Sequence, residues 1–166
     1  PDTSIRRIHA RRVWDSRGRP TVEAEVTTGS GAVGRAIAPA GASTGSGEAV
    51  DRRDGGSPFG GLDVQDALGA VRTEIAPALA GMDVTDQAAV DRRLIALDGT
   101  ANKSRLGGNA TIAVSMAVAH AAAAANGMPL WRWLAGGDAA DGPVVMPLPE
   151  IQIFGGGAHA DARVDL

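Results

Sequence analysis

The sequence contains no cysteine, and aromatic residues make up only 3% of its 166 residues. Without cysteine, the chain has no disulfide framework, no thiolate metal site and no thiol redox chemistry. This absence agrees with a reducing compartment, and we expect a cytoplasmic protein. Because bulky aromatic side chains are scarce while alanine and glycine are abundant, the core must gain its stability from the close approach of backbones.

The chain also lacks a dense block of positive charge. Its formal net charge is -3, and charged residues make up 21% of the sequence. The nearest approach to a basic cluster is a group of four arginines, Arg6, Arg7, Arg11 and Arg12. No aromatic stacking partners accompany them, so we interpret them as solvated and expect no nucleic-acid partner.

No hydrophobic run has the length of a membrane span. The most apolar stretch, residues 113–125, has about a dozen residues, whereas a span needs about 20. We interpret this stretch as a buried helix and expect no membrane partner. Residues 1–12 carry charges, which is not typical of the apolar part of a signal peptide.

The first 40 residues have the pattern of an antiparallel sheet. Strands are expected over residues 4–14, 21–27 and 32–38. The sequence GSGAVG at residues 29–34 matches the dinucleotide-binding pattern, but that site needs a helix directly after it. Because a strand follows, we interpret these glycines as a hairpin turn.

Apolar residues recur at helical spacing from residue 63 onward. Helices are expected over residues 63–77, 86–97, 109–126 and 129–134. Thr85 is the expected cap of the second helix, and Asn126 with Gly127 the expected end of the third. A sheet followed by helices predicts an α+β domain over residues 1–135.

A second unit is expected after this domain. Residues 136–143 are polar and rich in glycine, which is typical of a linker. Residues 144–149 and 151–154 have the pattern of new strands. We therefore interpret residues 144–166 as the start of a further, incomplete domain.

Small residues fill the segment 39–47, for which two interpretations remain open. It is either a plain surface loop, which its composition favours, or a lid over a phosphorylated ligand. In a lid, a hydroxyl group would complete the octahedral oxygen shell that Mg²⁺ demands.

Two further groups of polar residues are candidates for function. His159 follows three glycines at the end of a strand-like run, where an imidazole can enter a cleft; His9 and His120 lack such a setting. Arg17 lies in an expected turn between strands, at residues 15–18, and a local ion pair and a partner interface are equally compatible with it. The carboxylates of Glu48, Asp51 and Asp54 are spaced for one helical face, and flanking arginines favour a solvated surface over a metal cluster.

Six short motifs occur in the order in which enolases have them. They are residues 15–23 (DSRGRPTVE), 41–45 (GASTG), 53–55 (RDG), 97–100 (LDGT), 102–104 (NKS) and 107–115 (GGNATIAVS). The sequence therefore resembles the enolase family, through its amino-terminal capping domain and the first strands of its TIM-type (α/β)8 barrel. The resemblance implies a Mg²⁺-dependent lyase of glycolysis that interconverts 2-phosphoglycerate and phosphoenolpyruvate.

The resemblance also assigns roles to individual residues. Ser43 matches a lid serine that ligates Mg²⁺, and the rest of the lid is Gly41, Ala42 and Thr44. His159 matches a histidine that contacts the small phosphorylated acid.

Two charged residues match positions at the dimer interface of the family, namely Arg17 and Glu23. A homodimer or higher homo-oligomer is therefore implied. The catalytic lysine and carboxylates of the family have no counterpart in these 166 residues, so we expect this chain alone to be inactive.

The sequence departs from the family pattern at four positions. Ala40 replaces a serine, Arg19 an asparagine, Gly155 an asparagine and Ala158 a glutamate. Each lost buried hydrogen bond costs about 1–3 kcal/mol of substrate binding or changes what is bound. Two alternatives therefore stand beside the lyase: a relative that acts on a phosphonate analogue, as in carboxyphosphonoenolpyruvate synthesis, and a non-catalytic binding protein with the enolase fold.

Overall fold

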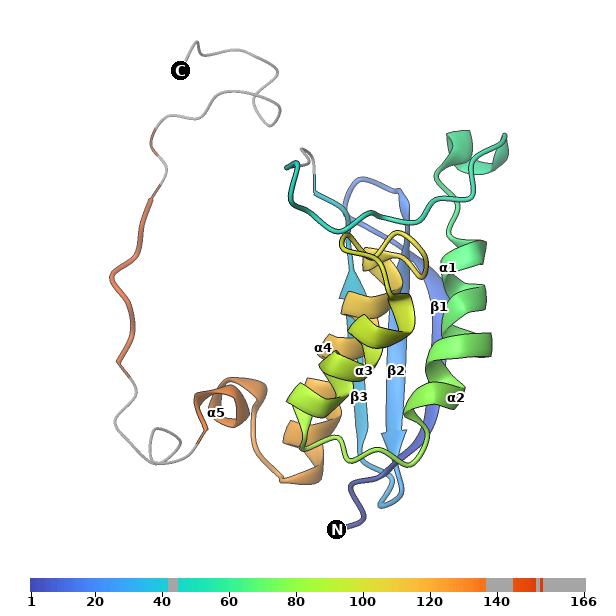
Figure 1. The fold of residues 1–166 in the computed structure, drawn as a ribbon. Helices are drawn as coiled ribbons and strands as arrows, with labels where there is room; N and C mark the ends of the chain where they lie inside the picture. Colours follow the sequence, from blue (N-terminus) through green and yellow to red (C-terminus); the bar gives the residue numbers. More distant parts are fainter. Residues whose placement is uncertain (42–44, 137–144, 152, 154–166) are drawn as a thin grey trace.

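A three-stranded antiparallel sheet in the order β1-β2-β3 forms one layer of the protein (Figure 1). The structure is a computed structural model that describes residues 1–41, 45–136, 145–151 and 153. Its strands are β1 (Ile5–Trp14), β2 (Pro20–Thr28) and β3 (Val33–Ala38). The three expected strands are confirmed, and their ends differ from expectation by at most one residue.

The turn between β2 and β3 confirms the hairpin interpretation of the GSGAVG sequence. Thr28 N donates to Ala32 O at 2.9 Å, and Gly31 has a φ of 86°, which favours glycine. Strand β3 follows directly, so no helix N-terminus faces these glycines as a dinucleotide phosphate would require.

Helices make up the second half of the domain. They are the 3₁₀ turn η1 (Pro58–Gly61), α1 (Gln65–Ala70), the π-helical η2 (Val71–Ile75), α2 (Ala76–Leu79), α3 (Gln87–Asp98), α4 (Gly108–Ala125) and α5 (Leu130–Ala135). The segment α1–η2–α2 is continuous and corresponds to the helix expected at residues 63–77. The other three expected helices are confirmed, and the α+β class with them.

The expected cap of α3 was wrong by one residue. The Asp86 carboxylate accepts a hydrogen bond from Ala89 N at 2.9 Å, which makes Asp86 the N-cap. The Thr85 hydroxyl instead donates to Asp83 at 2.8 Å. Aspartate and threonine are both good N-cap residues. Here the hydroxyl of Thr85 is used in the turn with Asp83, and the Asp86 carboxylate caps the helix. At the other expected boundary, Gly127 follows α4 with a φ of 66°, as predicted.

Helix α4 packs across β2 and β3, while α1–η2–α2 covers β1 on the same face of the sheet (Figure 1). The inward side chains of β2, those of Val22, Ala24 and Val26, are fully buried. Gly34 of β3 faces α4 so closely that a Cβ there would lie 2.1 Å from Ala117 O. The core is thus built on close backbone approach, as the composition predicts.

Helix α4 has the length and apolar character of a membrane span, and among the described helices only it does. However, 67% of it is buried inside the domain, where its alanines and valines contact the sheet. This burial agrees with the interpretation of residues 113–125 as a core helix.

One of the four amino-terminal arginines is not solvated in the way we expected. The guanidinium of Arg12 lies 4.7 Å from the ring centroid of Phe59 and 5.4 Å from that of Trp14. It also pairs with the Asp63 carboxylate at 2.8 Å. The expectation overlooked Trp14, two residues from Arg12, and could not show Phe59, which is 47 residues away in sequence and is brought to β1 by the fold.

The strands expected at residues 144–149 and 151–154 are not formed where the structure describes them. Residues 145–151 have no strand assignment, and Val145, Leu148 and Ile151 are 79–91% exposed. A strand needs a hydrogen-bonding neighbour, and none of the described residues pairs with this segment. Most of the proposed linker and residues 154–166, including His159, lie outside the described residues.

Candidate functional site

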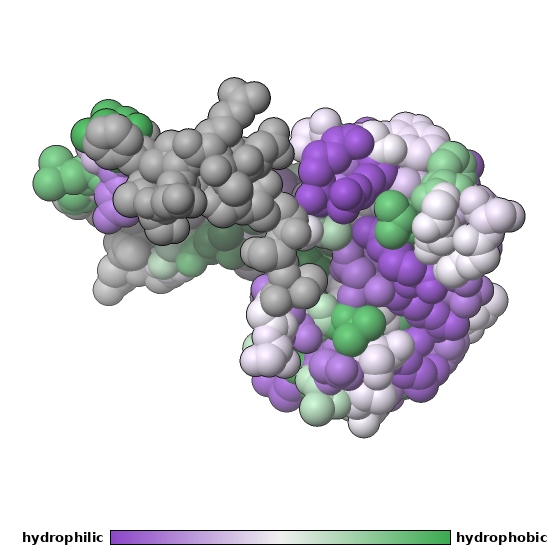
Figure 2. Space-filling view, turned by 90° about the horizontal axis from the view of Figure 1, so that it is seen from above, coloured by the Kyte–Doolittle hydropathy of each residue, from purple (hydrophilic) through white to green (hydrophobic). Residues whose placement is uncertain are grey.

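Several connections meet at one end of the sheet, where β1 turns into β2 and β3 ends (Figure 1). Helix α4 begins at this end as well. Seen from above in Figure 2, hydrophilic residues predominate on the described surface of the domain here. The segment 42–44, which includes Ser43, follows β3 at this end and lies outside the described residues.

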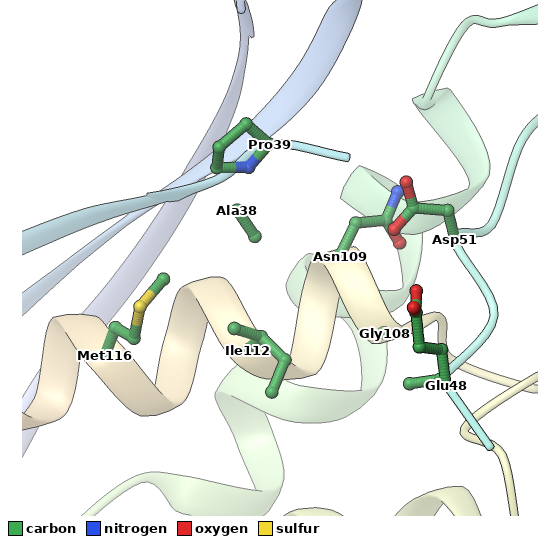
Figure 3. Close-up of a pocket in the computed structure, with 9 residues that line it drawn as sticks. Ala38, Pro39, Glu48, Asp51, Gly108, Asn109, Ile112 and Met116 are labelled. Carbon is green, nitrogen blue, oxygen red and sulfur yellow. The ribbon is translucent and has the colours of Figure 1, made fainter. Parts of the chain in front are cut away.

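A pocket of about 310 Å³ opens beside the last residues of β3 (Figure 3). It is lined by Ala38, Pro39, Glu48, Ala49, Asp51, Gly108, Asn109, Ile112 and Met116. In Figure 3, the carboxylates of Glu48 and Asp51 stand at one side of the pocket, and the apolar side chains of Ile112 and Met116 rise from α4. The pocket therefore has carboxylate oxygens at its rim and an apolar floor.

The turn between β1 and β2 is held by one carboxylate. Asp15 accepts hydrogen bonds from Arg19 N and Arg17 N, each at 2.9 Å, and its side chain is only 3% exposed. These donors lower the pKa of Asp15, the Arg19 amide most strongly, and the guanidinium of Arg17 contributes at 3.3 Å. The turn is thus a rigid feature at this end of the sheet.

The end of β3 is bound to this turn and to β2. The hydroxyl of Thr21 donates to Ala38 O at 2.6 Å. The guanidinium of Arg17 donates to Ala40 O, one residue before Gly41. The chain is therefore fixed up to the residue that precedes the expected lid.

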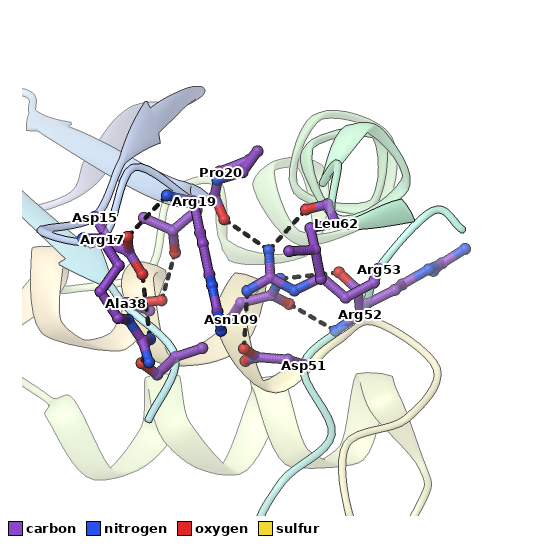
Figure 4. A network of polar contacts seen from close by, with 12 residues as sticks. Asp15, Arg17, Arg19, Pro20, Ala38, Asp51, Arg52, Arg53, Leu62 and Asn109 are labelled. Carbon is purple, nitrogen blue, oxygen red and sulfur yellow. Dashed lines mark hydrogen bonds and ion pairs between the residues drawn. The ribbon is translucent and has the colours of Figure 1, made fainter. Parts of the chain in front are cut away.

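The chain that follows the expected lid is fixed by Arg53 (Figure 4). Its guanidinium donates to Pro20 O at 2.6 Å and to Leu62 O at 2.8 Å, and it pairs with Asp51 at 3.2 Å. The side chain is 18% exposed. A planar group with five donors suits this arrangement, because one residue satisfies three acceptors at once.

Asn109 joins the same segment to α4. Its side chain is 1% exposed, accepts from Arg52 N at 3.2 Å and donates to Arg52 O at 3.0 Å. Two backbone bonds add to this contact: Val50 N donates to Asn102 O and Gly108 N to Val50 O. The side-chain amide of Asn109, which follows Gly107 and Gly108, thus binds the backbone of Arg52 to the start of α4.

The acidic residues at 48, 51 and 54 are not on one helical face, which corrects the spacing argument. The segment that carries them is irregular, and each carboxylate has a structural partner. Glu48 accepts from Gly45 N, Asp51 pairs with Arg53, and Asp54 accepts from the amides that begin α1. Their role is to shape this segment.

The predicted site residues are distributed unevenly over the structure. Gly41, three residues after the end of β3, is exposed. Ala42, Ser43, Thr44 and His159 lie outside the described residues, so no distance between them is stated.

The two residues matched to a dimer interface lie in different settings. Arg17 bonds within the chain, as the local interpretation of this residue predicts. Glu23 lies on the sheet face opposite α4 and pairs with Arg11 and Arg35. In both ion pairs the atom of Glu23 that faces the guanidinium is Oε1, and Arg35 Nε lies 3.7 Å from it.

Sequence reasoning missed the contributions of Arg53 and Asn109. Both occur in the quoted motifs, which was a signal that the positions matter, but their contacts span 33 and 57 residues. Spacing along a single segment does not show such contacts.

We next ask whether the described residues fit a magnesium ion. Mg²⁺ prefers oxygen ligands in octahedral geometry. No cluster of three acidic or histidine side chains that could hold a metal occurs within residues 1–41 and 45–136. The nearby carboxylates of Glu48 and Asp51 are already engaged. The acidic side chains that the structure describes at this end of the sheet therefore do not form a magnesium centre by themselves.

The lowered pKa values of four carboxyl groups predict how the stability of the fold depends on pH. Asp15, Glu25, Asp63 and Asp98 all have lowered pKa values in the folded chain. The largest cause is the hydrogen bond from Arg19 N for Asp15 and the one from Arg35 for Glu25. For Asp63 and Asp98 the largest single influence is burial, which raises the pKa, but several hydrogen bonds together, led by those from Arg12 and from Leu106 N, lower it by more. A carboxyl whose pKa is lower when folded stabilises the fold above its unfolded pKa of about 4, and this contribution is lost as the pH falls further.

The expected result is a urea midpoint that drops between about pH 5 and pH 3. These groups contribute no change between pH 6 and pH 8, which serves as the internal control. A midpoint that stays constant or rises on acidification to pH 3 would contradict the assignment.

Comparison with known proteins gives two findings. The family model described as enolase, N-terminal domain, matches residues 5–134. The protein named enolase from Acidothermus cellulolyticus is 53% identical over 162 residues, which cover 98% of this chain. The chain spans 37% of the length of that relative.

Proposed function

Because the chain belongs to the enolase family through its amino-terminal domain, we propose that the whole protein is a Mg²⁺-dependent lyase that reversibly dehydrates 2-phosphoglycerate to phosphoenolpyruvate. The observation that carries this proposal is the family match over residues 5–134, which includes the connection after β3 where Ser43 lies. The fixed chain on both sides of that connection supports it. We place this activity in the cytoplasm.

In this proposal, the chain contributes the lid and one imidazole. Ser43 provides a hydroxyl ligand to the metal, while Gly41, Ala42 and Thr44 let the lid approach the ligand closely. His159 contacts the substrate near its leaving hydroxyl. Mg²⁺ would stabilise the negative charge that develops when the proton next to the carboxylate is removed.

The proposal extends to domains and assembly. Residues 136–143 would link the capping domain to a TIM-type barrel that begins at residues 144–166. A homodimer or higher homo-oligomer would use Glu23 and Arg17.

The full-length protein should convert 2-phosphoglycerate only when Mg²⁺ is present. The ultraviolet absorbance of the enol phosphate that forms measures this conversion. Ser43→Ala removes a metal ligand and should lower kcat/KM at limiting Mg²⁺ by about tenfold or more, equivalent to about 1.4 kcal/mol. Ser46→Ala is the matched control, since Ser46 is an exposed serine of the same segment and matches no metal ligand. Turnover without Mg²⁺, or by the 166 residues alone, would refute the proposal.

Two other functions are motivated by specific residues. Gly155, Ala158 and Ala40 remove polar groups that enolases have, which favours a substrate such as a phosphonate analogue. Full-length protein would then prefer the phosphonate, and ordinary rates with 2-phosphoglycerate would remove the reason for this alternative. Loss of the barrel lysine and carboxylates in the rest of the protein would instead indicate a non-catalytic binding protein.

A further inference from the structure

We propose that a pocket between α3, α4 and α5 binds a small organic cation, namely a protonated amine on a short apolar body. The pocket has a volume of about 320 Å³ and is formed where α4 packs against both other helices (Figure 1). This volume lies within the range of small-molecule sites in proteins. The inference goes beyond the lyase activity proposed above and does not depend on it.

Apolar side chains from two helices line much of this pocket. Met116 and Ala119 belong to α4, and Leu130 and Leu134 belong to α5. Leu134 is 65% exposed and Met116 is 37% exposed, so both keep apolar surface in contact with water. A ligand with a hydrocarbon body would cover this surface and gain affinity by removing it from water.

Asp91 of α3 is the one acidic residue among the described residues that line the pocket. Its Oδ1 accepts hydrogen bonds from the Ser115 hydroxyl at 2.7 Å and from Gln87 Nε2 at 3.0 Å. Its Oδ2 accepts no hydrogen bond from any residue that the structure describes, and this atom is not closed off from solvent. The two bonds therefore hold the carboxylate in place and leave one oxygen for a ligand.

The other polar side chains around Asp91 use their donors on one another. Gln87 Nε2 donates to Ser115 Oγ at 3.0 Å as well as to Asp91, and the Ser115 hydroxyl donates to Asp91. Gln87 Oε1 is buried and has no donor among the described residues. The pocket is thus short of donors, so a ligand should bring N–H groups. Because Asp91 is negatively charged, a positive charge on that ligand adds affinity.

His120 is the other titratable residue that lines the pocket within the described part of the chain, and it is exposed. No described lysine or arginine lines the pocket. A positively charged imidazole would repel a cationic ligand. Binding is therefore best measured at pH 8, where a histidine side chain is ordinarily neutral and an aliphatic amine is still protonated.

The experiment titrates the full-length protein at pH 8 with 2-phenylethylamine and, as a neutral control of the same shape, with 2-phenylethanol. The ¹³C-labelled methyl groups of Leu130 and Leu134 report binding at this pocket by NMR, and the fully buried Leu79 is the internal control. The amine should shift both reporter signals until they saturate. It should bind about tenfold more tightly than the alcohol, as expected for one charged hydrogen bond.

Three variants separate the charge from the shape of the pocket. Asp91→Asn keeps an oxygen that accepts from Ser115 and Gln87 but loses the charge, so it should weaken amine binding about tenfold and leave alcohol binding unchanged. Asp66→Asn makes the same charge change at a side chain that is 61% exposed and should match wild type. Ala119→Leu fills the pocket and should weaken binding of both ligands, which tests the site even if Asp91→Asn fails to fold.

Several results would overturn the proposal. Equal affinities for the amine and the alcohol, or equal behaviour of Asp91→Asn and Asp66→Asn, would leave Asp91 with only a structural role between α3 and α4. Unshifted Leu130 and Leu134 signals would show that another part of the whole protein closes the pocket, and a shift at Ile112 alone would place the amine elsewhere. Because binding is measured without turnover, absence of the proposed lyase activity would not alter these outcomes.

Discussion

Gly34→Ala should destabilise the domain by about 3 kcal/mol or more, a large share of the stability of a domain of this size. An added Cβ would lie 2.1 Å from both Ala117 O and Ala121 N, which are backbone atoms of α4. Backbone cannot rotate away as a side chain does, so sheet and helix must move apart. That movement would open the contacts of the fully buried Val22 and Val26.

The matched control is Gly69→Ala, since Gly69 lies in α1 and an added Cβ meets nothing within 4 Å. Alanine should stabilise the helix there by about 0.5–1 kcal/mol, because it is the better helix former. Urea unfolding followed by circular dichroism measures both changes. A Gly34→Ala variant within 1 kcal/mol of wild type would show that α4 does not approach β3 as described.

Asp98→Ala should cost about 3 kcal/mol, the second-largest effect that we expect. Asp98 ends α3 with an exposure of 2%, where a negative charge opposes the helix dipole. It is kept there by hydrogen bonds from Leu106 N at 2.8 Å and from the amide of Thr100 at 2.9 Å, with the Thr100 hydroxyl as a third donor. Alanine leaves these donors without an acceptor and frees the chain between α3 and α4.

Asp66→Ala is the control for this change, because its side chain is 61% exposed and its contact to Arg52 is long at 3.4 Å. It should change the free energy of unfolding by less than about 0.5 kcal/mol. Asp98→Asn should lie between the two, since one of its two polar atoms remains an acceptor. If Asp98→Ala and Asp66→Ala cost the same, the buried hydrogen bonds of Asp98 contribute little.

The secondary structure could be predicted where local pattern and tertiary packing agree. Alternation in β2 and helical spacing in α4 both reflect which side chains become buried, so their patterns indicated the core directly. The GSGAVG sequence was interpreted correctly because the residues after it exclude a helix. The strands expected around residues 144–154 are not formed within the described residues 145–151, because a strand depends on neighbours that the local sequence does not show.

The candidate site was less predictable than the fold. The lid and histidine were assigned from the resemblance, and residues 42–44 and 154–166 lie outside the described residues. Arg53 and Asn109, which hold the chain of residues 50–53, bind backbone atoms that are far away in sequence. Hydrophobic periodicity carries no information about a guanidinium that binds a distant carbonyl, and only the folded chain shows that contact.

The central claim is that a serine and a histidine of this chain meet at one metal-bound phosphorylated acid. A structure of the full-length protein with 2-phosphoglycerate and Mg²⁺ tests it most directly. We predict Ser43 Oγ in the coordination shell of a magnesium ion and the His159 ring in contact with the same substrate molecule. Ser43 and His159 facing separate cavities in that complex would contradict the account.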